Sequence, residues 1–114
     1  MKEFIFHWNN NEYYIYVGIN ANSNWKLLDN ALPYDILFHV DKYSSSYIIL
    51  NNKDIQLLKD IPRQVIKRCA CLCKSHSSSK SLKNINIKYT FIKNCNKGTV
   101  EGEVYMNNTK YIII

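Results

Sequence analysis

Two short apolar runs near the middle of the chain, Ile36–Val40 and Tyr47–Leu50, constrain its fold more than any other feature. Each has the length of a strand, is rich in Ile, Val and aromatic residues, and is bounded by polar residues, which is typical of buried β-strands. The polar segment Asp41–Ser46 separates the two runs. Pro33 comes just before the first run, where its missing N–H does least harm to strand pairing. The runs therefore predict a β-sheet at the centre of the fold.

The first run carries two polar side chains that are candidates for chemistry. Side chains alternate between the faces of a strand, so Ile36, Phe38 and Val40 share one face, while Asp35 and His39 share the other. An Asp with a His suggests acid–base catalysis. However, four residues of strand span about 13 Å at about 3.3 Å each, which excludes a direct Asp35–His39 pair unless the strand is broken. The simpler interpretation is a structural histidine that bonds a group in the polar segment.

The clearest helix of the chain is expected over residues 61–75. Asp60 is the expected cap, and Pro62 suits the first turn. When these residues are projected on a helical wheel at 100° per residue, an apolar stripe lies on one side and a basic stripe on the opposite side. The buried stripe consists of Val65, Cys69, Leu72 and Cys73, and the basic one of Arg63, Lys67 and Lys74, with Arg68 beside it.

Alternating polarity and turn residues predict the other elements. Residues 4–8 and 12–17 form strands of a hairpin, residues 25–32 form one or two helical turns capped by Asn24, and residues 84–93 form a strand. Residues 104–106 and 111–114 are expected to pair as a terminal hairpin. The fold class that follows is α+β: a single domain over 1–114, with a mainly antiparallel sheet and one principal helix packed on it.

Charge is distributed unevenly along the chain. The net charge is +6, yet the stretch 61–100 holds nine Lys and Arg residues and neither Asp nor Glu. Such a stretch predicts a positive surface, with nucleic acid as the first partner and an anionic membrane surface as the second. A solvated charge run without a partner explains the same pattern equally well.

Catalytic and metal chemistry find little support. The chain contains no GxSxG, P-loop or GxGxxG motif, and it has only three glycines. Cys69, Cys73 and His76 recur on one side of the expected helix, and Cys95 could complete a zinc site, but the chain has no CxxC pair. Neither a cofactor nor a metal is expected.

The cysteine spacing is not that of a disulfide framework, which favours a reducing compartment, the cytoplasm or the nucleus. No apolar run approaches the roughly 18 residues of a membrane span.

Several segments resemble one known family, the NFACT RNA-binding domain, and in particular its eukaryotic branch. Residues 35–40 read Asp-Ile-Leu-Phe-His-Val, similar to the family's Asp-Ile-Trp-Phe-His-Val. Residues 61–66 resemble its Ile-Pro-Lys-Glu-Val-Leu, and residues 84–97 resemble its Asn-Ile-Asn-Val…Tyr-Thr…Lys-Lys segment. The chain departs from the family where Ile19 replaces a basic residue and Tyr47 replaces a second histidine. The resemblance implies RNA binding without catalysis, in proteins that act on stalled ribosomes and tRNA, with Lys93 and Lys97 as basic positions.

The resulting hypothesis is a non-catalytic RNA-binding domain whose basic surface is built from residues 61–100. Basic side chains are expected to contact phosphates, and Tyr89 to stack on an unpaired base. His39 is expected at the edge of this surface. The candidate residues are Lys93, Lys97, Arg63, Lys67, Lys74, His39, Asp35 and Tyr89. The alternatives are a scaffold module that docks on a ribosomal or acidic protein, and a DNA-binding module.

Overall fold

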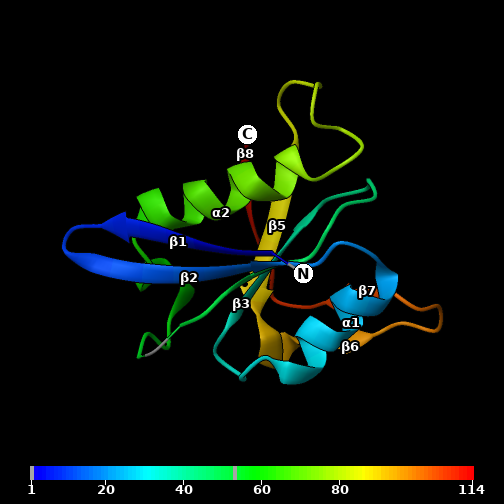
Figure 1. The fold of residues 1–114 in the computed structure, drawn as a ribbon, viewed down its shortest axis with the longest axis horizontal. Coiled ribbons are helices and arrows are strands. Elements are labelled where there is room, and N and C mark those ends of the chain that lie inside the picture. Colours follow the sequence, from blue (N-terminus) through cyan, green and yellow to red (C-terminus); the bar gives the residue numbers. More distant parts are fainter. Residues whose placement is uncertain (1, 53) are drawn as a thin grey trace.

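A computed structural model describes residues 2–52 and 54–114 (Figure 1). In chain order the elements are β1 (Lys2–Trp8), β2 (Asn11–Val17), α1 (Ala21–Asn30), β3 (Ile36–Val40), β4 (Ile48–Leu50), η1 (Leu58–Asp60), α2 (Arg63–Ser75), β5 (Asn86–Phe91), η2 (Ile92–Asn94), β6 (Cys95–Lys97), β7 (Val104–Met106) and β8 (Lys110–Ile113). The η elements are 3-10 turns. The expected α+β class is confirmed.

The principal sheet has six strands in the order β1-β2-β4-β3-β5-β8, and all its neighbours are antiparallel. The two central apolar runs supply β3 and β4, which pair with each other with Ile36 opposite Leu50 and Phe38 opposite Ile48. β3 also pairs with β5 on its other side. The run that dominates the sequence therefore lies in the interior of the sheet, where both of its edges are hydrogen-bonded.

Both faces of the sheet are covered, by different elements. On one face α2 packs over a core that includes Phe38, Val65 and Cys69. On the other face α1 and the small β6–β7 sheet cover Leu37, Tyr47 and Ile49. The alternation along β3 divides its side chains between these two cores, as predicted. Figure 1 shows α2 above the sheet and α1 with β6 and β7 below it.

The expected terminal hairpin is wrong. β7 pairs with β6, and β8 pairs with β5 at the edge of the principal sheet. The physical reason lies in burial, because Ile112 of β8 faces Ile87 and both are buried in the core below α2. Beyond β8, Ile114 and Ile85 exchange two backbone hydrogen bonds of 2.9 Å. Pairing with β5 thus buries a side chain that a local hairpin would leave exposed.

The helix ends also differ from the expectation. α1 begins at Ala21, because Asn20 and Ser23 form a capping box in which each side chain accepts from the other's backbone N–H. Asn24, the expected cap, is instead buried inside α1. α2 begins at Arg63 with Pro62 at the cap position, and Asp60 belongs to η1 and makes no capping bond.

The predicted stripe of α2 is confirmed: Val65, Cys69, Leu72 and Cys73 are buried, together with Ile66 and Ala70. Burial raises the pKa of the Cys73 thiol to about 12 and raises that of Cys69 further, so both behave as small apolar side chains. Among residues 2–52 and 54–114 there is no helix long and apolar enough to cross a membrane.

Candidate nucleic-acid interface

The outer surface of α2 presents the predicted basic side chains to solvent. Arg63, Lys67 and Arg68 are exposed, and Arg68 lies over the ring of Phe6 at 6.0 Å. Lys74 is half-buried, and its Nζ donates a 3.0 Å hydrogen bond to the carbonyl of Ile114. Within the described part of the chain, no ion pair involves any of these four cations. Arg63 and Lys67 are therefore available to a polyanion, whereas Lys74 has a structural partner.

The first turn of α2 adjoins a half-buried tyrosine. Tyr89 stacks on Phe38 with ring centroids 5.2 Å apart and 20° between the planes. Burial raises the pKa of Tyr89, and the nearby charge of Arg63 acts in the opposite direction. Lys110 of β8 stands opposite Tyr89 and shares its face of the sheet. The structure thus brings Arg63 and Tyr89 together, and it adds Lys110, which the sequence reasoning missed because β8 was paired with the wrong strand.

Lys93, in η2 just after β5, extends this arrangement. Its Nζ lies 4.8 Å from the ring centroid of Tyr34 and 5.8 Å from that of Phe91, within cation–π range. Tyr34 packs edge-on against Phe91 at 5.2 Å, and Phe91 shares a face with Tyr89 two residues earlier. We call Tyr34, Arg63, Tyr89, Lys93 and Lys110 the aromatic–basic surface. It places cations beside partly exposed rings, as binding to unpaired nucleotides requires.

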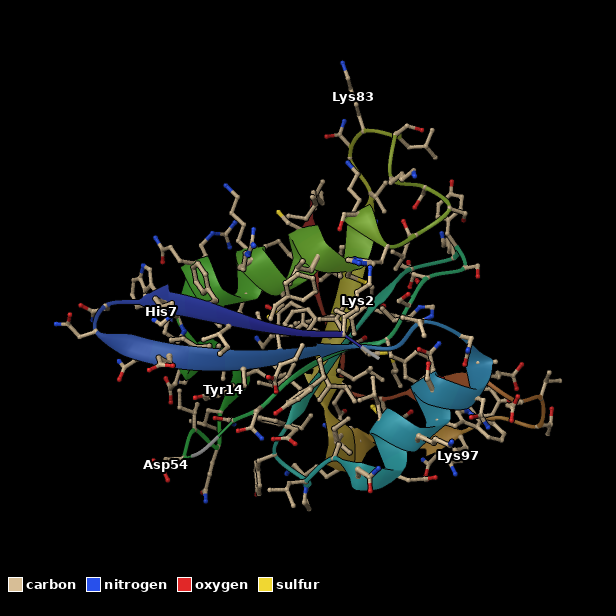
Figure 2. The ribbon with its side chains drawn as sticks, viewed as in Figure 1. Lys2, His7, Tyr14, Asp54, Lys83 and Lys97 are labelled. Carbon is tan, nitrogen blue, oxygen red and sulfur yellow. The ribbon has the colours of Figure 1, made fainter. Side chains whose placement is uncertain are left out.

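Lys97 lies elsewhere. It belongs to β6, forms a 2.6 Å ion pair with Asp29 of α1, and has its Nζ 5.0 Å from the Trp25 ring centroid. α1 and β6 cover the face of the sheet opposite α2. Figure 2 labels Lys97 at lower right, well away from α2, and Lys83 at the top of the loop after α2. The basic residues of 61–100 are therefore divided between two sides of the molecule.

Asp35 is an internal structural residue. Only 3% of its surface is exposed, and its two carboxylate oxygens accept hydrogen bonds of 2.9 Å from the Leu32 N–H and 3.0 Å from the Asn52 N–H. The carboxylate joins the turn before β3 to the segment after β4. Both of its oxygens are hydrogen-bonded to backbone N–H groups, and it does not form a catalytic pair with His39.

His39 is half-buried at the end of β3, and its Nδ1 lies 2.7 Å from the carbonyl oxygen of Val40. Because a carbonyl only accepts, Nδ1 carries the proton, and Nε2 is left as an acceptor in the neutral ring. Burial lowers the pKa of His39, with a smaller contribution in the same direction from Lys88 and opposing effects of Val40 and Asp41. The expected structural bond exists, although its partner is the last strand residue rather than the polar segment.

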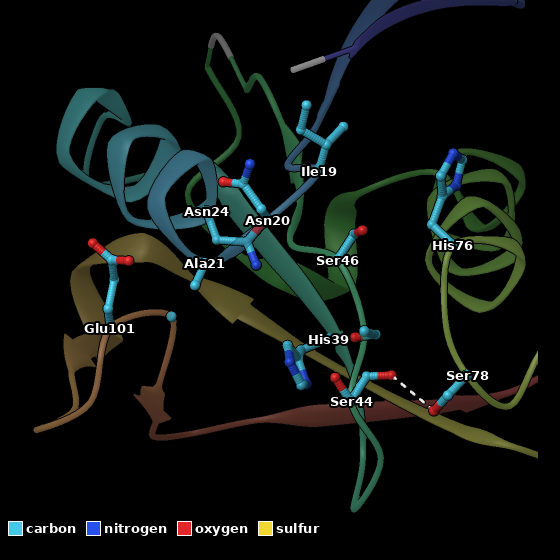
Figure 3. Close-up of a pocket in the computed structure, with 12 residues that line it drawn as sticks. Ile19, Asn20, Ala21, Asn24, His39, Ser44, Ser46, His76, Ser78 and Glu101 are labelled. Atoms are coloured by element: carbon cyan, nitrogen blue, oxygen red, sulfur yellow. Dashed lines mark hydrogen bonds between the residues drawn. The ribbon is translucent and has the colours of Figure 1, made fainter.

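A polar pocket of about 380 Å³ lies beside His39 (Figure 3). The residues that line it come from the segment 19–24, from β3 and the loop before β4, from the segment after α2, and from the turn at 101–102. They are Ile19, Asn20, Ala21, Asn24, His39, Ser44, Ser45, Ser46, His76, Ser78, Glu101 and Gly102. Of these residues, only His39 was a sequence-predicted site residue of the basic surface, and His76 was considered only as a zinc ligand, because the segments that line the pocket share no motif. In the described residues, no group of three or more His, Cys, Asp or Glu side chains could hold a metal ion.

Comparison with known proteins places this geometry in a family. The family model described as "NFACT protein RNA binding domain" matches residues 2–113. The chain is 37% identical over 90 residues to mouse coiled-coil domain-containing protein 25, covering 78% of the chain and 43% of that protein. It is 30% identical over 104 residues to the Dictyostelium discoideum homolog, covering 89% of the chain and 50% of that protein. The chain thus spans about half the length of these relatives or less.

A solved structure has the same fold. It is the C-terminal part of the fibronectin/fibrinogen-binding protein of Streptococcus suis, with a TM-score of 0.83 and 19% identity over the whole of this chain and 45% of the other. At this identity the likeness concerns the fold alone. The family match covers nearly all the described residues, and it agrees with the segments that carried the resemblance in the sequence. The chain therefore belongs to the NFACT RNA-binding domain family.

Proposed function

We propose that this domain binds RNA without catalysis, through the aromatic–basic surface and the outer side of α2. The observation that carries the proposal is the position of Lys93 over the Tyr34 ring, next to the Arg63–Tyr89 pair. Cations in this position neutralise phosphates, and the counterions that the nucleic acid then releases contribute to the affinity of binding. Half-buried rings beside them offer stacking surfaces for bases that are not paired.

The surface on α2 is favoured over the side that carries Lys97. Lys97 is paired with Asp29 at 2.6 Å, whereas the Lys93 ammonium lies over two aromatic rings and forms no ion pair among the described residues. A phosphate that binds Lys97 competes with a carboxylate already in place, and one that binds Lys93 does not. We therefore assign Lys93, Arg63 and Lys67 to phosphate contacts and Tyr89 to stacking, and we leave Asp35 out of the interface.

The preferred ligand is structured or single-stranded RNA such as tRNA or ribosomal RNA, and the proposed setting is the quality control of stalled ribosomes. The family description supports RNA as the class of ligand. The absence of a disulfide among the described cysteines, all of them free, is compatible with the cytoplasm or the nucleus as the proposed location.

The test is a titration of the domain with labelled tRNA, single-stranded RNA and duplex DNA over a salt series. Two double variants with the same change of charge are compared, Arg63→Glu/Lys93→Glu on the proposed surface and Lys26→Glu/Lys97→Glu on the opposite side. The first is expected to lower RNA affinity at least tenfold, and the second is expected to change it little. A greater loss of RNA affinity in the second variant would place the interface on the α1 side. A preference for duplex DNA would favour the DNA-binding alternative.

Protein docking is the second candidate function. β8 is an edge strand of the principal sheet, and Tyr111 and Ile113 on it are 55% and 63% exposed. An exposed edge with apolar side chains is a site at which a peptide can add a strand. Weak salt dependence, together with capture of an acidic or ribosomal protein that Tyr111→Lys abolishes, would support this function over RNA binding.

A further inference from the structure

The polar pocket beside His39 has hydrogen-bonding groups without partners. The Nδ1 atoms of His39 and His76 face the carbonyls of Val40 and Leu72, at 2.7 and 2.9 Å, so each donates its proton to the backbone. Both Nε2 atoms remain as acceptors. No hydrogen bond among the described residues uses either of them. Two residues that line the pocket therefore each have an acceptor nitrogen that the tautomer of the ring leaves free.

Asn24 adds a fixed donor. Only 7% of its surface is exposed, and its Oδ1 accepts from the Tyr47 N–H at 3.3 Å. Gly18 leaves room for this oxygen, since a Cβ at that position would overlap it. The Nδ2 group has no hydrogen-bond partner in the described part of the chain. Every fully enclosed polar side-chain atom there does have a partner, so Nδ2 is not fully enclosed. Asn24 also lines the pocket, so its amide nitrogen is an accessible donor on a largely buried side chain, and a ligand can satisfy it.

The charge of the pocket selects the kind of ligand. Among the described residues that line it there is neither Lys nor Arg, Glu101 contributes a carboxylate, and burial favours the neutral form of His39 by lowering its pKa. A phosphate or other anion would lose its hydration there and meet a carboxylate instead of a cation. A neutral, planar group with both donors and acceptors fits the lining, and about 380 Å³ is within the range of small-molecule sites.

The loop that contains Ser78 also carries two exposed lysines. Ser78 lines it, and the exposed Lys80 and Lys83 follow in the same loop, which Figure 2 shows projecting beyond α2. In Figure 3, Ser78 reaches across to Ser44 on the loop before β4, and its Oγ donates to the Ser44 carbonyl at 3.3 Å. A polar cavity thus opens beside a cationic loop.

We propose that this pocket accepts the base of one unpaired nucleotide. Its edge is recognised by Asn24 Nδ2 and by the Nε2 acceptors of His39 and His76, while the flanking phosphates lie outside against Lys80 and Lys83. The inference rests on the proposed RNA binding and adds to it a site that distinguishes a base from a bare sugar–phosphate backbone. Such a site binds single-stranded or looped RNA in preference to a duplex, in which bases are stacked and paired.

The experiment compares two single-stranded oligonucleotides of equal length. One is wholly abasic, and the other carries a single 2-aminopurine base among abasic positions. The protein is expected to bind the base-bearing strand about tenfold more tightly, as one base contact provides. The variant Ser78→Trp fills the pocket mouth from an exposed position and is expected to bring the ratio close to one, with the same affinity for the abasic strand. Ser81→Trp, at an exposed serine of the same loop that does not line the pocket, is the control and keeps the ratio.

The outcomes separate this inference from the function on which it rests. Equal, salt-dependent binding of the two strands by the unmodified protein overturns the pocket and leaves RNA binding in place. Retention of the preference in Ser78→Trp also overturns it. Failure to bind either strand overturns the pocket, and failure to bind tRNA and single-stranded RNA as well overturns both proposals. Titration with adenosine and with ribose 5-phosphate gives a second readout. Adenosine is expected to shift the imidazole NMR signals of His39 and His76, and larger shifts with ribose 5-phosphate contradict a base site.

Discussion

The hydroxyl of Tyr47 donates a 2.6 Å hydrogen bond to the carbonyl of Gly102, 55 residues away. Tyr47 is fully buried just before β4, so this bond ties the interior of the sheet to the turn between β6 and β7. Trp25 assists, as its Nε1 donates to the Glu103 carbonyl at 3.0 Å. The two bonds hold the turn between β6 and β7 against the principal sheet and against α1.

Tyr47→Phe is expected to lower the free energy of unfolding by about 1–2 kcal/mol, because the carbonyl of Gly102 loses its buried donor. Urea denaturation gives this value, and hydrogen exchange should show faster opening of residues 98–104 than of β3. Tyr105→Phe, on the exposed side of β7, is the control and should leave the urea midpoint unchanged. Uniform acceleration of exchange across the sheet would contradict a local role for the bond.

Asp35→Ala is expected to lower the free energy of unfolding by about 3 kcal/mol, since the N–H groups of Leu32 and Asn52 lose a charged acceptor. Asp35→Asn, which keeps one oxygen, should lose less. Any variant that remains folded should bind RNA with unchanged affinity under stabilising conditions. Reduced affinity in a fully folded Asp35→Asn protein would return this residue to the interface.

His39 predicts a pH dependence of stability. Burial lowers its pKa in the folded state, so the unfolded chain binds the proton first as the pH falls below about 6.5. The stabilising effect of the neutral ring is thus complete at higher pH and declines as the solution becomes acidic. Lys88 and Asp41 act on the ring in opposite directions. Urea denaturation between about pH 5 and 8 should give a steeper loss for the unmodified protein than for His39→Gln, whereas the exposed His7→Gln should follow the unmodified curve.

Single charge removals on the proposed surface should reduce the salt dependence of RNA binding. Arg63→Ala and Lys93→Ala are each expected to lower the slope of log affinity against log salt by about 0.7, the value for one phosphate contact with a single strand. Lys26→Ala, on the exposed side of α1, should leave the slope unchanged. Lower affinity without a change of slope would show that the two residues act on the fold rather than on phosphates.

Most of the fold could be predicted where a pattern is local. The alternation in β5 predicts that Ile87 and Phe91 enter the same core, and the apolar stripe of α2 predicts which of its side chains pack on the sheet. The pairing of β8 could not be predicted in this way. Its partner β5 lies more than ten residues earlier, and the choice between β5 and β7 depends on whether Ile112 is buried.

Only part of the candidate site could be predicted, because only some of its residues belong to a local pattern or motif. Arg63 and Lys67 follow from helical periodicity, and Lys93 from a family motif. The separation of Lys97 from them depends on η2 and β6, which carry the chain to the other face of the sheet. Asp35 belongs to the family motif, but its backbone partners at Leu32 and Asn52 come together only in three dimensions. The pocket beside His39 has contributions from four separate segments, so periodicity gives no indication of it.

The position of β8 also bears on how the protein is made. The strand supplies Ile112 to the core below α2, and Ile114 closes the bonds to Ile85. A nascent chain that ends before residue 110 has most of its sheet but leaves the edge of β5 open and an apolar gap at Ile87. Stable folding of the domain therefore requires residues 110–114 to have been synthesised and to have paired with β5, and until then the open edge of β5 is exposed to pairing with other chains.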